Sequence, residues 1–267
     1  MKVKEILGAL EEFAPLALQD GYDNAGLQIG LAEDAEATGA LLCLDVTEDV
    51  VDEAVQFGCN LIVSHHPLLF HPVKSITAGD YVGRTILKAI RNNVAVYAAH
   101  TNLDSAFEGV NFKMAEKMGL KNLQCLSPKC EYQRKGETVS AGEGLIGTLP
   151  QPLTQKELME QVKEVFNLRS LRVNNAEPRK VTKVALCGGS GAFLIPKAIE
   201  MGADAFVTGE IGYHNFFGHE KDLLLMEIGH YESEQYTLEI LHDVVSKAVP
   251  SLSVYCTEKN TNPINYL

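Results

Sequence analysis

The sequence predicts an α/β protein made of two related halves. Short apolar runs alternate with helix-like segments along the 267 residues, and residues 40–70 align without gaps with residues 184–214 at an offset of 144. Histidines, some with a carboxylate four residues further on, follow several of the apolar runs. Strands alternating with helices are typical of α/β folds, and polar groups that follow such strands mark the edge of the sheet where ligands bind.

The first element is an amphipathic helix over residues 1–13, MKVKEILGALEEF. Its apolar residues Ile6, Leu10 and Phe13 recur at helical spacing, and acidic residues alternate with the basic ones. A signal peptide would instead have a basic start and an uninterrupted apolar run. Nowhere does the chain contain an apolar run of membrane-spanning length. We therefore expect a cytoplasmic protein that does not contact a membrane.

The internal repeat predicts the next elements. In each copy an apolar strand precedes a helix that ends at a glycine, Gly58 or Gly202, and a second strand follows. The aligned strand residues include Cys43 with Cys187 and Val63 with Val207. The alternative is that any two strand–helix–strand units resemble each other through shared hydrophobic patterning.

A polar connection separates the two halves. The segment SPKCEYQRKGETVSAGEG is rich in turn formers, so we place a first half at residues 1–126, a connection at 127–143 and a second half at 144–267. Thr154 and Glu157 form a capping-box pattern that predicts a helix from about Gln155.

Adjacent histidines follow the second strand of the first copy, in NLIVSHHPLLF. In a continuing strand their rings would point to opposite faces, but Pro67 should end the strand and turn the backbone. Both rings then face one cavity, and imidazole is the commonest side-chain ligand of metal ions. Two rings on consecutive residues favour a two-metal site, with a strand-end pair that bonds only to backbone or water as the alternative.

Two more segments carry ligand types at equal spacing. His100 and Asp104 follow one apolar run, and His230 and Glu234 follow another. A spacing of four places the imidazole and the carboxylate on one helical face. In the repeat His66 aligns with Glu210, and a different offset aligns His100 with His230. The two halves are therefore expected to bring strand-end polar groups towards each other.

Five separated motifs resemble the Nif-three-like dinuclear metal proteins, which are widely named as GTP cyclohydrolase I type 2 homologues. They are GYDNAGLQIG at 21–30, SHHPLLF, HTNLD, GEIGYH and GHYESE, in the order of that family. The resemblance implies the Nif-three-like fold, with mixed sheets flanked by helices and the metal site between the halves. It also implies five metal ligands, with Glu234 as the bridge between two ions: His65, His66, Asp104, His230 and Glu234. The chain departs from the family pattern at Gly212 and Tyr213, where members often show Ser-His, and it is too short for the domain that some members insert.

The chemistry of these ligands is that of a catalytic site. Imidazole and carboxylate without thiolate suit two divalent ions of zinc, iron, manganese, cobalt or nickel, and the ligand type does not choose among them. Five ligands for two ions leave open coordination positions, as in catalytic sites. A water shared by the ions would ionise near neutral pH and attack carbon or phosphorus.

Further residues are candidates for catalysis or substrate contact. His100 and Glu210 are candidates for holding a ligand histidine or transferring protons, although His100 is equally read as a satisfied strand-end histidine. Asp23 or Asn24 is expected to orient substrate or a group that surrounds the metal ligands, with an Asx turn as the alternative. The glycines of CGGSG at 187–191 suit either a phosphate contact or a tight strand–helix turn.

Function is predicted as far as a reaction class. The net charge of −12 disfavours nucleic acid. We expect a dinuclear metal-dependent hydrolase of a nucleotide-like or phosphorylated small molecule, and the resemblance implies GTP cyclohydrolase activity and a homohexamer. A metal-binding regulatory or metal-delivery protein without turnover is the alternative.

Overall fold

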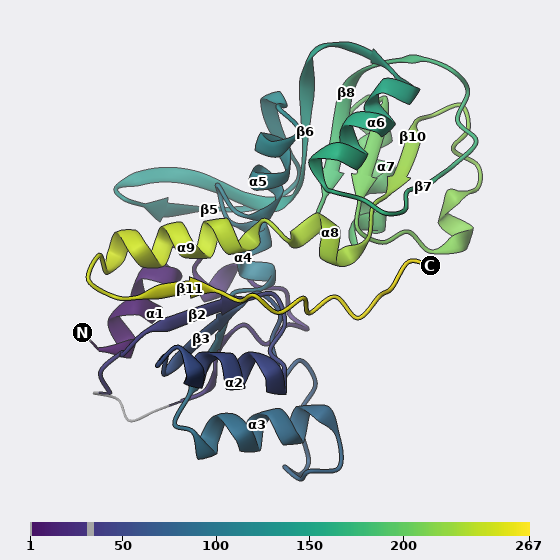
Figure 1. Ribbon diagram of the computed structural model, residues 1–267. Coiled ribbons are helices and arrows are strands. Elements are labelled where there is room, and N and C mark those ends of the chain that lie inside the picture. Colours follow the sequence, from purple (N-terminus) through teal and green to yellow (C-terminus); the bar gives the residue numbers. More distant parts are fainter. Residues whose placement is uncertain (1, 31–34) are drawn as a thin grey trace. The chain divides into compact units, whose positions relative to one another are not determined.

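The computed structural model describes residues 2–30 and 35–267, and Met1 of the predicted first helix lies outside these ranges. The chain forms two compact units, each with one mixed sheet flanked by helices (Figure 1). The first unit comprises Met1–Ala106 and Thr237–Pro263, and the second comprises Phe107–Tyr236 and Ile264–Leu267. The α/β class with two mixed sheets is as predicted.

The first unit contains a five-stranded sheet in the order β1-β4-β3-β2-β11. Strands β2, β3, β4 and β11 are parallel, and β1 is antiparallel to β4. Helices α2 and α3 cover one face, and α1 and α9 pack together on the other (Figure 1). The bounds of the strands and helices in this unit are α1 Val3–Phe13, η1 Leu16–Leu18, β1 Gly26–Ile29, β2 Ala40–Cys43, α2 Glu48–Gln56, β3 Leu61–Ser64, α3 Tyr81–Arg91, β4 Ala95–Ala98, α4 Thr101–Ser105, α9 Thr237–Ala248 and β11 Val254–Cys256.

The second unit contains a six-stranded sheet in the order β5-β6-β8-β9-β10-β7. Its centre, β8-β9-β10, is parallel, while β6 and β7 pair antiparallel on either side. Apolar residues of α5 and α6 pack on one face and those of α7 on the other. The bounds are α5 Val110–Lys117, β5 Lys121–Arg134, β6 Glu137–Thr154, α6 Gln155–Val165, β7 Arg172–Val173, β8 Lys180–Cys187, η2 Gly191–Leu194, α7 Ile195–Glu200, β9 Ala205–Thr208, η3 Tyr213–Phe216, β10 Leu224–Glu227 and α8 His230–Glu234.

The sequence repeat corresponds to a structural repeat. Ala40 pairs with Leu61 across β2 and β3, and the aligned residues Val184 and Ala205 pair in the same way across β8 and β9. The helix ends also match, because Gly58 and Gly202 have φ of 71° and 72°. Glycine takes this left-handed conformation without a steric cost and closes the last turn of each helix. Similarity of hydrophobic pattern alone would not reproduce both the register and the cap.

The predicted connection at 127–143 differs from the structure. These residues lie in strands β5 and β6, a long antiparallel hairpin that turns at Lys135 and Gly136, both with positive φ. Both faces of most of the hairpin are partly or fully exposed, so its sequence lacks the alternation that identifies a half-buried strand. The predicted boundary at 144–267 also differs, because α9 and β11 belong to the first unit.

Two local predictions are confirmed. Helix α1 buries Val3, Ile6 and Leu10 along one face. Helix α6 begins after Thr154, whose side chain accepts a hydrogen bond from the Glu157 amide in the predicted capping box. Within residues 2–30 and 35–267, no helix is long and apolar enough to cross a membrane.

Candidate metal centre

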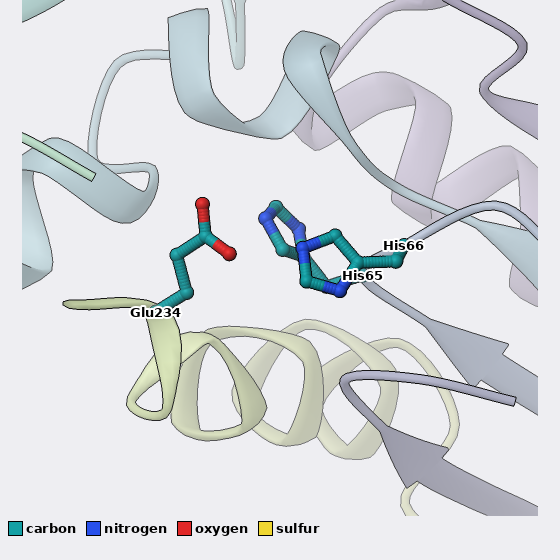
Figure 2. A group of neighbouring side chains, drawn as sticks. All are labelled: His65, His66 and Glu234. Atoms are coloured by element: carbon teal, nitrogen blue, oxygen red, sulfur yellow. The ribbon is translucent and has the colours of Figure 1, made fainter. Parts of the chain in front are cut away.

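His65 and His66 directly follow β3, where the chain leaves the sheet (Figure 2). Their ring centroids lie 4.9 Å apart, and the ring of His100, which follows β4, lies 5.4 Å from His65 and 5.5 Å from His66. The turn predicted from Pro67 therefore gathers the rings instead of placing them on opposite faces of the sheet. His65 is fully buried.

Hydrogen bonds fix which nitrogen of each ring is available. His65 Nδ1 lies 2.7 Å from the carbonyl oxygen of Ala99, and His66 Nδ1 lies 2.8 Å from Asp45 Oδ1. Both oxygens accept, so each Nδ1 donates and each Nε2 keeps its lone pair. This is the tautomer and orientation that metal-binding histidines have in proteins. Burial raises the pKa of Asp45, but the hydrogen bonds from His66 and Thr261 outweigh it, and the pKa lies below its usual value.

Asp104 is the carboxylate among the candidate metal ligands of the first unit. Its Oδ1 lies 3.6 Å from His65 Nε2, which is too long for a normal hydrogen bond. Ligand–metal distances of about 2.0–2.2 Å place two ligands of one ion roughly 3–3.5 Å apart. The separation of 3.6 Å lies just above this range, so both atoms could bind one cation after a small shift.

His100 is held by the loop that precedes β1. Its Nδ1 lies 2.8 Å from Asp23 Oδ1, while Asp23 Oδ2 accepts hydrogen bonds from the amide and hydroxyl of Thr101. Burial raises the pKa of Asp23, but the hydrogen bonds from His100 and Thr101 outweigh it and lower the pKa to about 2. Asp23 accordingly orients His100, and Asn24 binds the carbonyl oxygen of Leu69 through its side chain.

We predict that the Asp23 carboxylate stabilises the first unit in a pH-dependent way. A pKa of about 2 against 3.8 in the unfolded chain corresponds to about 2 kcal/mol. Since the folded pKa is the lower one, this contribution is complete above pH 4 and is lost as the pH falls towards 2. Urea unfolding of chelated protein should show Asp23→Asn to be less stable at pH 6, with a smaller difference at pH 3. A difference that is independent of pH would contradict this.

In the second unit, α8 carries His230 and Glu234 on one face (Figure 2 shows Glu234). His230 Nδ1 lies 2.8 Å from Glu210 Oε1, and its Nε2 lies 3.2 Å from Glu234 Oε2. Glu210 follows β9, as predicted from its alignment with His66. It fixes the ring of His230 as Asp45 fixes that of His66. Glu234 is buried, with 3% of its surface exposed.

The three glycine amides of the CGGSG turn are bonded within the protein, as in a tight strand–helix turn. The amides of Gly188, Gly189 and Gly191 donate to Asn111 Oδ1, Ser233 Oγ and Thr208 Oγ1, each at 3.0 Å. Gly189 has φ of 58°, and a Cβ there would lie 2.5 Å from Glu234 Oε1. The turn therefore shapes the position of the Glu234 carboxylate.

We predict that Gly189→Ala lowers metal occupancy. The added methyl group would displace the Glu234 carboxylate, and alanine in this backbone conformation costs about 1–2 kcal/mol. Elemental analysis after dialysis measures the effect. Gly136→Ala, a glycine with positive φ in the β5–β6 turn and open space around it, is the matched control. Equal metal loss in both variants would assign the effect to stability alone.

The donor set fits a transition-metal site. His65, His66 and Glu234 each offer an atom of a kind that binds metal ions, and buried imidazoles with their Nδ1 atoms already bonded suit that role. Sequence reasoning identified His65, His66, His100, Asp104, Glu210, His230 and Glu234. It missed Asp45, whose only sequence signal was its place two residues after β2.

These features define a protein of two α/β units with candidate metal-binding residues at the carboxyl ends of parallel strands. Residues 1–263 match the model of the Duf34/NIF3 (NGG1p interacting factor 3) family, and the chain belongs to this family. A relative from Clostridium acetobutylicum, named GTP cyclohydrolase 1 type 2 homolog, is 32% identical over 100% of this chain and 99% of its own.

Another relative and two solved structures are also similar to this chain over its whole length or nearly so. A Staphylococcus epidermidis relative of the same name is 27% identical over an alignment of 367 residues that covers both chains completely, so it is longer than this chain. The crystal structure of a Staphylococcus aureus hypothetical protein has a TM-score of 0.89 at 30% identity, covering 100% of this chain and 99% of that one. Reduced HcgD from Methanocaldococcus jannaschii has a TM-score of 0.80 at 27% identity, covering 97% and 98%.

Proposed function

We propose that the chain is a metal-dependent hydrolase of a nucleotide-like or phosphorylated small molecule. Two divalent ions would be bound by His65, His66, Asp104, His230 and Glu234, with Glu234 bridging them. The observation that carries the proposal is that His65, His66 and His230 each have their Nδ1 bonded to an acceptor, the arrangement in which metal-binding histidines coordinate an ion through Nε2. When bound, such ions polarise an electrophile and lower the pKa of water.

The surrounding side chains have separate roles in this proposal. Asp45 and Glu210 hold the rings of His66 and His230. His100 is the candidate for proton transfer, because Asp23 binds its Nδ1 and leaves its Nε2 for a substrate or water proton. Asn24 holds the loop after Pro67 through Leu69.

The finer proposal is a GTP cyclohydrolase, which opens the imidazole ring of GTP with loss of formate. The names of the relatives support it. Among the basic residues near the ligands in sequence, Arg84 pairs with Glu48 and Lys113 with Glu116, which reduces their charge for a triphosphate. GTP is therefore one member of the substrate panel below.

We also propose a cytoplasmic homohexamer that binds neither nucleic acid nor membrane. Apolar residues near the candidate site residues in sequence can belong either to the core or to a contact surface between subunits. Leu68 is buried, whereas Phe70 and Phe217 are 37% and 59% exposed. The two phenylalanines are thus the residues that support an assembly surface. Sedimentation equilibrium giving a monomer at micromolar concentration would exclude the hexamer.

One experiment tests the function. Protein purified without an affinity tag is analysed for metals and then screened with GTP, other nucleotides and phosphoesters in the presence of its native metal. We expect two ions per chain and turnover of at least one substrate, abolished by chelation. One ion or fewer under metal-replete conditions would exclude the dinuclear site. Exchangeable metal without turnover or nucleotide affinity would favour metal delivery or regulation.

A further inference from the structure

The segment after β11 lies along the first sheet and is anchored by a buried carboxylate. Strand β11 pairs in parallel with β2, and the Thr257 amide continues this pairing by donating to the Leu42 carbonyl. Glu53 on α2, only 3% exposed, accepts from the Thr257 hydroxyl and from the Glu258 amide at 2.9 Å. Residues 257–258 are therefore fixed to the core of the first unit.

Three residues further on, the segment reaches Asp45. Thr261 Oγ1 donates to Asp45 Oδ2 at 2.8 Å, while Asp45 Oδ1 accepts from His66 Nδ1 at 2.8 Å. One oxygen of the carboxylate is thus bonded by the C-terminal segment and the other by the proposed metal ligand.

The sheet order explains why these groups meet. β11, β2 and β3 are neighbouring parallel strands, so their carboxyl ends share one edge of the sheet. The chain beyond each strand supplies one of the three hydrogen-bonded residues: Thr261 after β11, Asp45 after β2 and His66 after β3. A hydrogen bond from Thr261 restricts rotation of the Asp45 carboxylate, which in turn restricts the ring of His66.

We infer that Thr261 is a positioning residue for the metal ligand His66, and that metal binding and docking of residues 257–261 are coupled. The inference rests on His66 binding a metal, as proposed above. If a docked segment raises metal affinity, bound metal must favour docking by the same factor, because linkage is reciprocal. Residues 257–261 would then be docked more of the time in the metal-bound protein than in the metal-free protein.

The alternative is that Thr261 only anchors the segment. Substitutions that keep or remove the hydroxyl separate the two roles. Thr261→Val keeps the shape and loses the donor, while Thr261→Ser keeps the donor. The matched control is Thr138→Val in the β5–β6 hairpin, where the lost hydroxyl accepts from the exposed side chain of Gln133.

The test is a zinc titration of the metal-free full chain against a chromophoric chelator. We expect Thr261→Val to weaken zinc binding about tenfold, the size typical of losing a group that orients a ligand. Thr261→Ser should remain within about twofold of the parent chain, and Thr138→Val should match it. Zinc affinity unchanged in Thr261→Val would overturn the inference while leaving the metal site intact. Absence of zinc binding in the parent chain would overturn the proposed function together with it.

A second measurement does not depend on the variants folding. Hydrogen exchange of the parent chain, with and without zinc, follows the amides of residues 254–261. We expect zinc to slow their exchange, and the hairpin amides of residues 131–139 to be unaffected. Equal exchange of residues 254–261 in both states would exclude the coupling.

Discussion

Glu234→Gln should leave the protein without either metal ion, whereas Asp104→Asn should mainly weaken one. Glu234 is buried beside His230 Nε2, and as a bridge its charge would offset that of both ions. A neutral amide of the same shape cannot do so. Asp104 Oδ1 lies 3.6 Å from His65 Nε2, and in the proposed site Asp104 binds one ion and does not bridge the two.

Elemental analysis after dialysis against a weak chelator measures both variants. We expect affinity losses of at least about a hundredfold for the bridging position, beyond the 10–100-fold found for groups that only orient ligands. Glu232→Gln, on the same short helix, is the matched control and should keep both ions. Equal loss of metal in the Glu234 and Asp104 variants would argue against the bridge.

His65→Ala should abolish metal binding and turnover together. His65 is fully buried, and its Nδ1 is bonded to the Ala99 carbonyl, so its alanine variant loses a donor atom whose position is fixed by the fold. Asn24→Ala should instead reduce turnover with both ions retained, because Asn24 holds the loop at Leu69 and is not a ligand.

These outcomes are distinguished by measuring the metal content and the turnover of the substrate that the screen identifies. Circular dichroism shows whether each variant is folded. His242→Ala, an exposed histidine on α9, is the control for loss of an imidazole. A His65 variant that hydrolyses the substrate at the parent rate after chelation would exclude the dinuclear hydrolase and favour the regulatory or delivery protein.

Local patterns in the sequence were sufficient for several of these features. The apolar run before His65 and the proline after His66 predict a strand that ends and turns, and the structure has β3 ending at Ser64. The aligned glycines Gly58 and Gly202 predict equal helix ends, and both have positive φ. Such signals are readable because helix caps, strand ends and hydrophobic periodicity depend on residues within a few positions of each other.

The hairpin shows where local patterns fail. The polar composition of residues 127–143 is that of a loop, yet these residues form β5 and β6 by pairing with each other and, through β6, with β8. Cross-strand pairing depends on partners supplied by the fold, so strand propensity is strongly dependent on context. The same holds for α9 and β11, which join the first unit although they follow the second in sequence.

The sequence by itself determined the α/β class, the internal repeat, the family and the seven candidate site residues, because motif spacing and hydrophobic period are properties of the chain. Only the tertiary structure decided which side chains orient these residues. Asp23 accepts a hydrogen bond from His100, Asp45 accepts one from His66, and Asp45 is in turn bonded by Thr261. Thr261 and Asp45 are 216 residues apart. They meet because β11 inserts beside β2, and nothing in either local sequence specifies that neighbour.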